Sequence, residues 1–257
     1  MSERRPPGTL VLVPNTLDLG TEAPTDLRDV LPDGVIRRAA ALTHWVVEDA
    51  KSARALLKRV DALAPLAQPL QAIAIAELPR PRKGSGEAVP AAEWQRLLQP
   101  ALDGHDLGLI SEAGLPAVAD PGAALVEAAH RAAVPVLPLP GASSLLLALA
   151  ASGLNGQSFA FVGYLPQEAP ARAARLKELE ALSRRSAQTQ LFIETPYRNA
   201  AVLEAMLQAL GSETRITVAC GITLPGGFCR TDTVARWRAQ APALPERWPA
   251  VFGLLAR

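Results

Sequence analysis

Five turns rich in glycine, proline and serine are the segments of this chain best suited to binding a ligand. They cover residues 13–20, 111–122, 138–144, 163–166 and 194–198, and each follows a short apolar run. Such residues let a backbone approach a ligand closely and direct its N–H groups toward it. Any one of these turns could be an ordinary connection of an α/β protein, but together they predict a binding site made largely of backbone.

Several common catalytic motifs are absent from the 257 residues. No G-x-G-x-x-G follows the first apolar run and no G-x-x-x-x-G-K-[ST] occurs, which argues against a dinucleotide fingerprint and a P-loop. The run Gly141–Leu145 lacks the second glycine of a nucleophile elbow. The three histidines lack metal-ligand spacing, and Cys220 and Cys229 are too few for a four-cysteine zinc site. We therefore expect no metal site, and so few cysteines are typical of a reducing compartment.

Composition places the chain among ordinary globular proteins. Hydrophobic residues make up 49% and charged residues 20%, and the net charge is +1, so there is no overall electrostatic footprint for nucleic acid. The apolar run Leu10–Val13 is too short for a secretory signal. Prolines and glycines interrupt the uncharged stretch from Ala132 to Gln167, which argues against a membrane-spanning helix. We expect a soluble, cytoplasmic protein.

The elements that must position the turns alternate between strands and helices. Strands are predicted at Leu10–Val13, Gln71–Ala76, Leu107–Ile110, Val134–Leu139, Phe159–Tyr164, Gln190–Glu194, Arg215–Cys220 and Val251–Ala256. Helical patterns lie between them; Asp49, Asp120 and Ser143 are expected to cap helices, and Gly153 to end one. The alternation predicts two α/β domains, 1–139 and 140–257, with mainly parallel sheets whose ligands bind beyond the carboxyl ends of the strands.

A series of short motifs follows a fixed order along the chain: Val13-Pro14, Glu48-Asp49, residues 111–116, Asp120-Pro121-Gly122, residues 138–141, Ser152-Gly153-Leu154, residues 161–166 and residues 194–198. This order resembles that of the tetrapyrrole methylase superfamily. Within the superfamily the chain is most similar to the branch that methylates a cytidine ribose 2′-oxygen in 16S ribosomal RNA. The resemblance implies S-adenosylmethionine (SAM) as methyl donor, two α/β domains with the cofactor folded into the cleft between them, and a homodimer.

The resemblance also implies roles for individual residues. It places Pro14, Gly114, Pro116, Val118, Ser143, Ser144 and Leu165 beside the cofactor. Glu48, Asp49 and Glu112 become catalytic candidates, because a carboxylate near the acceptor oxygen could act as a base or hydrogen-bond acceptor; alternatively, Asp49 only caps a helix. Apart from the resemblance, the basic residues Arg80, Arg82 and Lys83 could contact phosphates on the substrate side, or could simply form a solvated surface. Glu194 and Arg198 are also placed on the substrate side, where they could form an ion pair with either a structural role or a role toward the substrate.

Two polar segments depart from the pattern of that branch. Residues 77–86 replace a segment rich in His, Asn and Glu, and Cys220–Leu224 replaces an Arg-Glu-Leu-Thr-Lys stretch. Glu112 stands where the branch has an aspartate. The acceptor therefore stays open: ribosomal RNA leads, and the alternatives are a small molecule such as a tetrapyrrole, or SAM binding without catalysis. The Pro79–Gly86 loop is predicted to gate the acceptor side.

Overall fold

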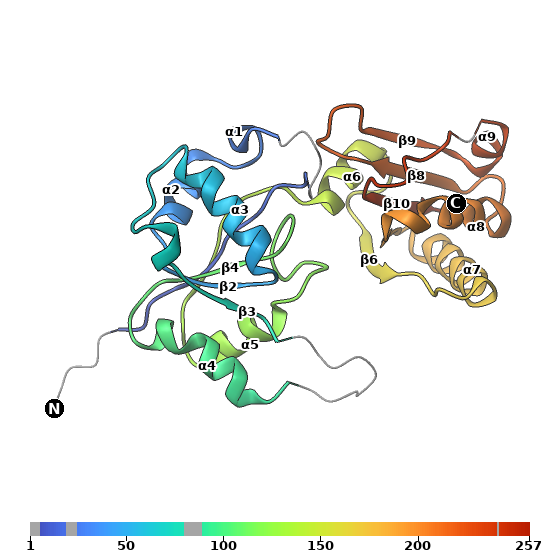
Figure 1. Ribbon diagram of the computed structural model, residues 1–257. Helices are drawn as coiled ribbons and strands as arrows, with labels where there is room; N and C mark the ends of the chain where they lie inside the picture. The colour runs from blue at the N-terminus through green and yellow to red at the C-terminus, as the bar shows by residue number, and fades with distance from the viewer. Residues whose placement is uncertain (1–5, 19–24, 80–88, 241) are drawn as a thin grey trace. The chain divides into compact units, whose positions relative to one another are not determined.

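The computed structural model describes residues 6–18, 25–79, 89–240 and 242–257. These residues form two compact units, Met1–Ala142 and Ser143–Arg257, each built on its own five-stranded sheet (Figure 1). Helices cover both faces of each sheet, so the chain is an α/β protein, as predicted. None of the described helices is long and apolar enough to cross a membrane.

The strands of the first sheet are all parallel. They are β1 (Leu10–Leu12), β2 (His44–Val47), β3 (Ala74–Glu77), β4 (Leu107–Ile110) and β5 (Val136–Pro138), in the order β3-β2-β4-β1-β5. Because carboxyl ends of parallel strands share one edge of a sheet, the connections that leave β1, β2, β4 and β5 begin side by side. Three of the five predicted turns lie at this edge.

Two predictions for this sheet are wrong. Sequence analysis gives no strand at β2, and it places the next strand at 71–76 rather than at Ala74–Glu77. Only three residues separate the end of helix α2 (Asp33–Ala40) from β2. In the sequence, the apolar residues at the end of the helix therefore run almost directly into those of the strand, and no clear boundary marks where the strand begins. The 3-10 turn Leu70–Ala72 occupies the start of the expected third strand.

Two layers of helices enclose the first sheet. The helices are α1 (Leu27–Val30), α2, α3 (Ala50–Asp61), α4 (Ala91–Leu102) and α5 (Ala123–Arg131). Alternate residues of β2 face opposite layers: Trp45 and Val47 pack with α2 and α3, whereas Val46 packs with α4 and α5. Gly108 on β4 makes room for Trp45, because a Cβ at residue 108 would lie 2.5 Å from the ring atom Cε3.

The second sheet is mixed, which corrects the expectation of mainly parallel strands. Its strands are β6 (Phe159–Tyr164), β7 (Thr189–Glu194), β8 (Arg215–Cys220), β9 (Phe228–Thr233) and β10 (Ala250–Leu255), in the order β6-β7-β10-β8-β9. β6 and β7 are parallel, whereas β10 is antiparallel to β7 and β8, and β9 is antiparallel to β8. Strand β9 was not predicted because its sequence, FCRTDT, is mostly polar. A short turn joins β8 to β9, and such a connection permits antiparallel pairing alone.

The helices of the second unit are α6 (Ser144–Ser152), α7 (Ala169–Ser186), α8 (Asn199–Ala209) and α9 (Val234–Ala239), with a 3-10 turn at Pro196–Arg198. Leu145 of α6 packs on one face of the sheet, and the apolar residues of α7, α8 and α9 pack on the other. Gly153 adopts a left-handed conformation with φ of +63° and ends α6, as predicted.

Candidate functional site

Hydrogen bonds join the turns after β1 and β4 at the carboxyl edge of the first sheet. The side-chain amide of Asn15 donates to the carbonyl oxygens of Ser111 at 3.1 Å and Glu112 at 2.8 Å. The backbone N–H of Asn15 donates to the Gly114 carbonyl at 2.8 Å, and the Gly114 N–H donates to the Thr16 carbonyl at 3.2 Å. Asn15 is buried, so these contacts fix the two turns to each other. Sequence analysis did not single out Asn15, although it lies in the first of the five turns.

The turn after β5 packs directly on the turn after β1. Pro14 is buried, and a Cβ at Gly141 would lie 2.3 Å from the Cβ of Pro14. The close approach therefore requires glycine at 141. A Cβ at Gly114 would lie 3.6 Å from the carbonyl oxygen of Ala142. The predicted turns around Pro14, Gly114 and Gly141 thus lie side by side and present a largely backbone surface.

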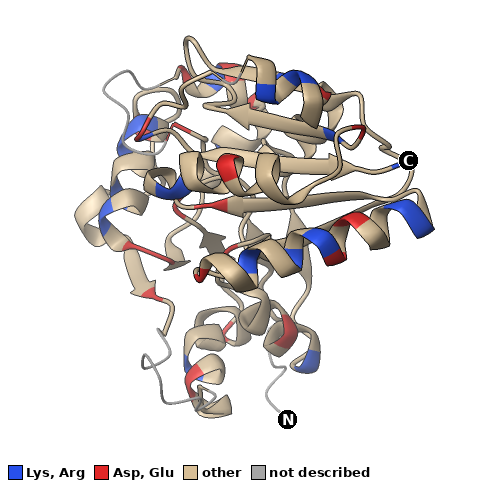
Figure 2. Cartoon of the chain, turned by 90° about the vertical axis from the view of Figure 1, so that its right-hand side faces the viewer, with Lys and Arg blue, Asp and Glu red and all other residues tan. Residues whose placement is uncertain are grey.

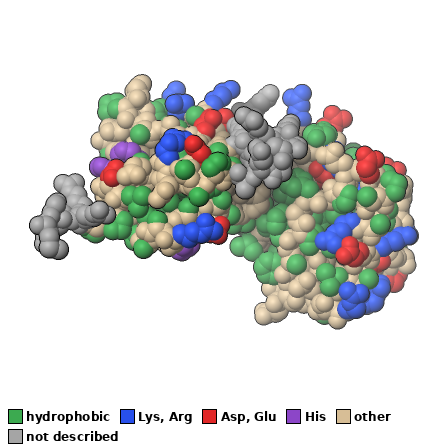
Figure 3. All heavy atoms as spheres, turned by 90° about the horizontal axis from the view of Figure 1, so that it is seen from below, with side chains coloured by type: hydrophobic (Ala, Val, Ile, Leu, Met, Phe, Trp, Pro, Cys, Tyr) green, Lys and Arg blue, Asp and Glu red, His purple; other side chains and the backbone are tan. Residues whose placement is uncertain are grey.

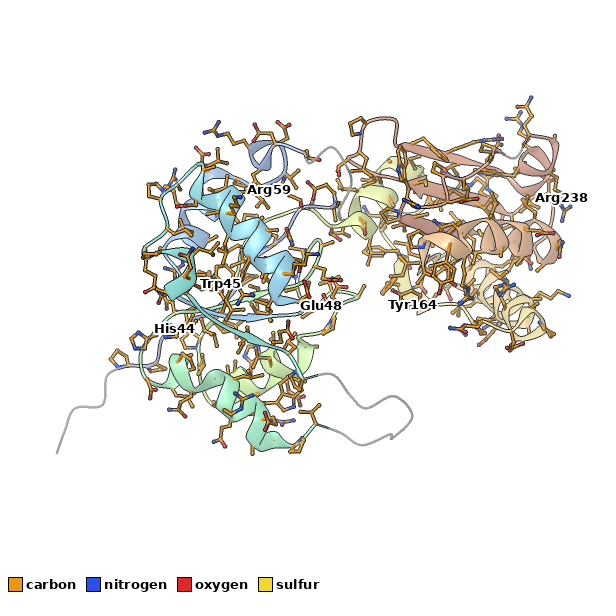
Figure 4. All side chains as sticks on the ribbon, in the orientation of Figure 1. His44, Trp45, Glu48, Arg59, Tyr164 and Arg238 are labelled. Atoms are coloured by element: carbon orange, nitrogen blue, oxygen red, sulfur yellow. The ribbon has the colours of Figure 1, made fainter. Side chains whose placement is uncertain are left out.

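Two of the predicted catalytic residues, Glu48 and Glu112, are in contact at the same edge. Glu48 follows β2, and its Oε2 accepts a hydrogen bond from the backbone N–H of Glu112 at 3.0 Å. The backbone N–H of Glu48 donates to the Ile110 carbonyl at 3.1 Å, so the pairing of β2 with β4 extends to Glu48. Figure 4 shows Glu48 beyond the end of β2, with Trp45 within the unit. The structure therefore brings together two of the three predicted catalytic residues.

The third, Asp49, begins a helix. Its carboxylate accepts a hydrogen bond from the backbone N–H of Ser52 at 2.7 Å, and α3 starts at the next residue. The backbone N–H of Ala50 donates to Oε1 of Glu77 at 2.9 Å. The capping role considered for Asp49 is confirmed, and a catalytic role stays a prediction.

The connection from β4 to α5 holds a fourth carboxyl group, Asp120. The prediction that Asp120 caps the next helix is wrong, because α5 begins at Ala123 and its cap residue is Gly122, with φ of +127°. The extra turn at Gly122 shifts the start of the helix. Burial, and after it the negative charges of Glu48 and Glu112, together raise the pKa of Asp120 to about 7. A carboxyl group with this pKa can take up and release a proton at neutral pH.

The same connection has unusual backbone angles. Ala117 and Ala119 have φ of +66° and +63°, and Gly114 and Gly122 also have positive φ. The left-handed conformation costs a residue other than glycine roughly 1–2 kcal/mol, so the surrounding contacts must hold the loop in this shape. Val118, between the two alanines, exposes 44% of its surface. Strained residues cluster at functional sites, which supports a role for this loop in binding.

The predicted cofactor residues of the second unit lie near α6 and after β6. Ser143 is buried and is the cap residue of α6, although its side chain makes no capping hydrogen bond, and Ser144 is the first residue of that helix. Leu165 is 3% exposed and packs with Leu176 and Phe192 in the core of the unit. Its expected place beside the cofactor stays a prediction.

The ion pair expected after β7 is present. Nη2 of Arg198 lies 3.0 Å from Oε2 of Glu194, whose side chain is 2% exposed. The other carboxylate oxygen of Glu194 accepts the backbone N–H of Thr195 at 2.8 Å. Tyr197 lies between the paired residues in sequence and exposes 77% of its surface. The buried pair therefore fixes a turn that presents an aromatic ring to solvent.

The remaining predicted site residues are placed as follows: Pro116 is buried in the first unit, and Arg80, Arg82 and Lys83 lie outside the described residues. Within the described ranges, no three His, Cys, Asp or Glu side chains are arranged to hold a metal ion. The face drawn in Figure 3 mixes hydrophobic side chains with charges of both signs, in keeping with the net charge of +1.

Residues 35–235, most of the chain, match the protein family described as Tetrapyrrole (Corrin/Porphyrin) Methylases. The chain belongs to this family. The match confirms the resemblance carried by the motifs and includes β2, β4 and the whole β4–α5 connection.

Relatives of this chain include proteins named ribosomal RNA small subunit methyltransferase I. The Vibrio cholerae protein is 40% identical over 129 residues, which is 50% of this chain and 43% of that protein. The Bacillus subtilis protein is 36% identical over 157 residues, or 60% of this chain and 52% of that protein. The matches thus span about half the length of the curated relatives.

Solved structures show the same fold. The methyltransferase CobJ has a TM-score of 0.55 at 19% identity, with 97% of this chain and 94% of that chain covered. Uroporphyrin-III C-methyltransferase from Thermus thermophilus, complexed with S-adenyl homocysteine, has a TM-score of 0.52 at 18% identity, with 96% and 97% covered. At these identities the likeness concerns the fold of the chain alone.

Proposed function

We propose that this protein is a SAM-dependent methyltransferase whose acceptor is a ribose 2′-oxygen of 16S ribosomal RNA. The observation that carries the proposal is membership of the tetrapyrrole methylase family together with 34–43% identity to proteins named ribosomal RNA small subunit methyltransferase I. The Thermus neighbour that binds S-adenyl homocysteine supports SAM as the methyl donor. We also propose that the protein acts in the cytoplasm, where ribosomal RNA is found.

The residues at the carboxyl edge of the first sheet suit the binding of SAM. SAM carries a cationic sulfonium and a cationic amine, and Glu48 and Glu112 supply negative charge at that edge. The backbone turns at Pro14, Gly114 and Gly141 offer a rigid surface without bulky side chains, and exposed Val118 offers an apolar contact. SAM would supply an activated methyl group, and the residues of the chain would orient the acceptor and exclude water.

We also propose that Ser143, Ser144 and Leu165 of the second unit contact the cofactor. The family resemblance supports this arrangement. We likewise propose the homodimer, which sedimentation of the purified protein would test by its mass.

Helix α3 is a proposed surface for the RNA backbone. Lys51, Arg54 and Lys58 are exposed and recur at spacings of three and four residues, so they lie along one face of α3. None of the three forms an ion pair with a described residue. Helix α3 starts directly after Glu48 and Asp49, so this basic face leads away from the proposed site. Arg80, Arg82 and Lys83 stay proposed as further phosphate contacts.

Figure 2 shows that basic residues also occur elsewhere, among acidic ones, on the helices of the second unit. Lys177, Arg184 and Arg185 of α7 are exposed, and they offer a control that removes the same amount of positive charge. Replacing Lys51, Arg54 and Lys58 by glutamine should weaken RNA binding and reduce the dependence of affinity on salt. The same change at the three α7 positions should have a smaller effect.

The direct test of the proposal has two parts. Calorimetric titration with SAM and S-adenosylhomocysteine should show one site per chain, and labelled methyl groups should then appear on small ribosomal subunits as a 2′-O-methylated nucleoside. Methyl transfer to a tetrapyrrole, and not to ribosomal RNA, would show that the acceptor is a small molecule. Binding without transfer to any acceptor would indicate a SAM-binding protein without catalysis, and absence of binding would overturn the proposal.

A further inference from the structure

We propose that Asp120 accepts the proton of the acceptor hydroxyl group during methyl transfer. This inference rests on the proposed function and names a proton acceptor other than Glu48, Asp49 and Glu112.

The position of Asp120 follows from the packing of the β4–α5 connection. Leu107 and Leu109 of β4 face the layer of α4 and α5, so Ser111, two residues further, continues that face. Gly122 lies over the same face, since a Cβ there would be 3.1 Å from Cδ2 of Leu109. Asp120 precedes Gly122 by two residues, and its carboxyl group is partly buried and close enough to feel the charges of Glu48 and Glu112, so it lies near the carboxyl end of β4.

Glu48 reaches the same place from β2. Val46 faces the layer of α4 and α5, and Glu48 follows it by two residues. The carboxylate of Glu48 is anchored by the backbone N–H of Glu112 at 3.0 Å. Besides burial, the negative charges of Glu48 and Glu112 act on the carboxyl group of Asp120.

Ser111 supplies a second, independent sign of a polar ligand here. The residue is 2% exposed, and its Oγ has no hydrogen-bond partner among the described residues. Buried hydroxyl groups in folded proteins nearly always have such a partner. A hydroxyl on the acceptor that bonds to Ser111 would lie at the carboxyl end of β4, the end from which the connection with Asp120 departs.

The environment of Asp120 suits a proton acceptor. Burial, followed by the charges of Glu48 and Glu112, brings its pKa to about 7. A base is most effective when its pKa lies near the working pH, because it is then partly deprotonated and still basic enough to take the proton. An ordinary aspartate, with a pKa of about 3.9, would be a far weaker base.

The proposed step balances atoms and charge. The acceptor oxygen forms a bond to the methyl carbon, and the bond between that carbon and the sulfonium sulfur breaks, with its electron pair remaining on sulfur. The hydroxyl proton passes to a carboxylate oxygen of Asp120, which becomes a neutral carboxylic acid. The products are the methyl ether, the thioether and protonated Asp120, which afterwards loses its proton to water.

The test compares Asp120→Asn with Asp103→Asn, a matched change at an exposed residue after α4. Three quantities are measured: SAM affinity by calorimetry, the single-turnover rate of methyl transfer from pH 5.5 to 9, and the titration of the Asp120 carboxyl carbon by NMR. The wild-type rate should rise with an apparent pKa of about 7. Asp120→Asn should lower the rate about 100-fold or more while SAM affinity changes less than about threefold, and Asp103→Asn should match the wild type.

A second variant separates proton transfer from a structural role. Glu48→Gln removes one negative charge near Asp120 while keeping an oxygen for the Glu112 N–H, so the pH profile and the carboxyl titration should both move to lower pH. The proposal is overturned if Asp120→Asn retains the rate, if it loses SAM affinity as steeply as rate, or if the Asp120 carboxyl titrates near pH 4. Failure of the proposed function looks different: the wild-type protein would bind no SAM, and the role of Asp120 in methyl transfer would fall with it.

Discussion

The carboxylate of Glu48 accepts the backbone N–H of Glu112 at 3.0 Å, although 64 residues separate the two in sequence. Their strands, β2 and β4, are neighbours in a parallel sheet, so both residues lie at the carboxyl edge where such sheets bind ligands. The contact orders the start of the β4–α5 connection, which carries Val118 and Asp120. An acidic side chain at the end of β2 thereby shapes the loop proposed to meet the donor and the acceptor.

Asn15→Ala should destabilise the first unit and weaken SAM binding. The change removes two side-chain hydrogen bonds to the carbonyls of Ser111 and Glu112, and leaving buried groups unpaired costs about 2 kcal/mol. Urea denaturation measures the free energy of unfolding, and calorimetry measures SAM affinity. Asn155→Ala is the control, because Asn155 bonds to the Ala187 carbonyl in the second unit. Equal SAM affinity in both variants would contradict the role given to Asn15.

Gly141→Ala should destabilise the protein by roughly 1–3 kcal/mol, the usual cost of overpacking. A Cβ at residue 141 would lie 2.3 Å from the Cβ of Pro14, so the turns after β1 and β5 would have to separate. Gly156→Ala is a matched control, since a Cβ there meets nothing within 4 Å. Thermal unfolding of both variants checks the prediction, and equal melting temperatures would show that the close approach of the two turns is unimportant.

Asp18→Asn should be destabilising near neutral pH and lose its effect in acid. Burial alone would raise the pKa of Asp18, but hydrogen bonds from Thr16 and Arg59, the charge of Arg59 and the Thr25 N–H outweigh it and lower the pKa. Arg59 lies 3.0 Å from the carboxylate. Because the folded-state pKa is depressed, the stabilisation exists above the unfolded pKa of about 3.9 and disappears as the pH falls through the lower folded value.

The expected loss at pH 7 is roughly 1–3 kcal/mol, as for hydrogen bonds to a charged group. Urea denaturation of wild type and Asp18→Asn from pH 7 down to pH 3 would reveal the convergence. A constant difference between the two proteins over that range would contradict the prediction.

Asp120→Asn should make the protein more stable at pH 8. The pKa of Asp120 is raised to about 7 in the folded state, so between pH 4 and pH 7 the folded protein binds more protons than the unfolded chain, and stability falls as the pH rises. Asp120 is partly exposed, so solvent screening limits the gain to about 1–2 kcal/mol. Unfolding experiments at pH 5 and pH 8 should show the difference at pH 8 and little of it at pH 5. Lower stability of the variant at pH 8 would contradict the raised pKa.

Local sequence patterns predicted the elements whose limits are clearly marked. The strands expected at Leu107–Ile110, Phe159–Tyr164 and Arg215–Cys220 have those bounds in the structure. Strand β2 was not predicted because an apolar helix closely precedes it in the sequence. Strand β9 was not predicted because its residues are mostly polar and its formation depends on pairing with β8. A strand was expected where β10 lies, but the alternation of strands and helices does not reveal that it runs antiparallel to β7 and β8.

Some residues of the candidate site could be predicted from the sequence and others could not. Local motifs were enough to predict Glu48, Glu112 and the turns around Pro14 and Gly114. The roles of Asn15 and Asp120 depend on partners distant in sequence: Asn15 binds carbonyls 96 and 97 residues later. The raised pKa of Asp120 requires burial together with Glu48, which comes from another strand. Such properties arise from the fold, and residue type alone does not contain them.

The position of β1 also determines when the site can form during protein synthesis. β1 lies between β4 and β5 in the sheet, and β5 starts at residue 136, 126 residues after the start of β1 at residue 10. At synthesis rates of about 5–20 residues per second, this interval lasts roughly 6–25 s. Throughout that time, β1 and the turn with Pro14 and Asn15 lack one of their two flanking strands. The first part of the site to be translated is therefore among the last to be buried, and the nascent chain presents it to chaperones and proteases in the meantime.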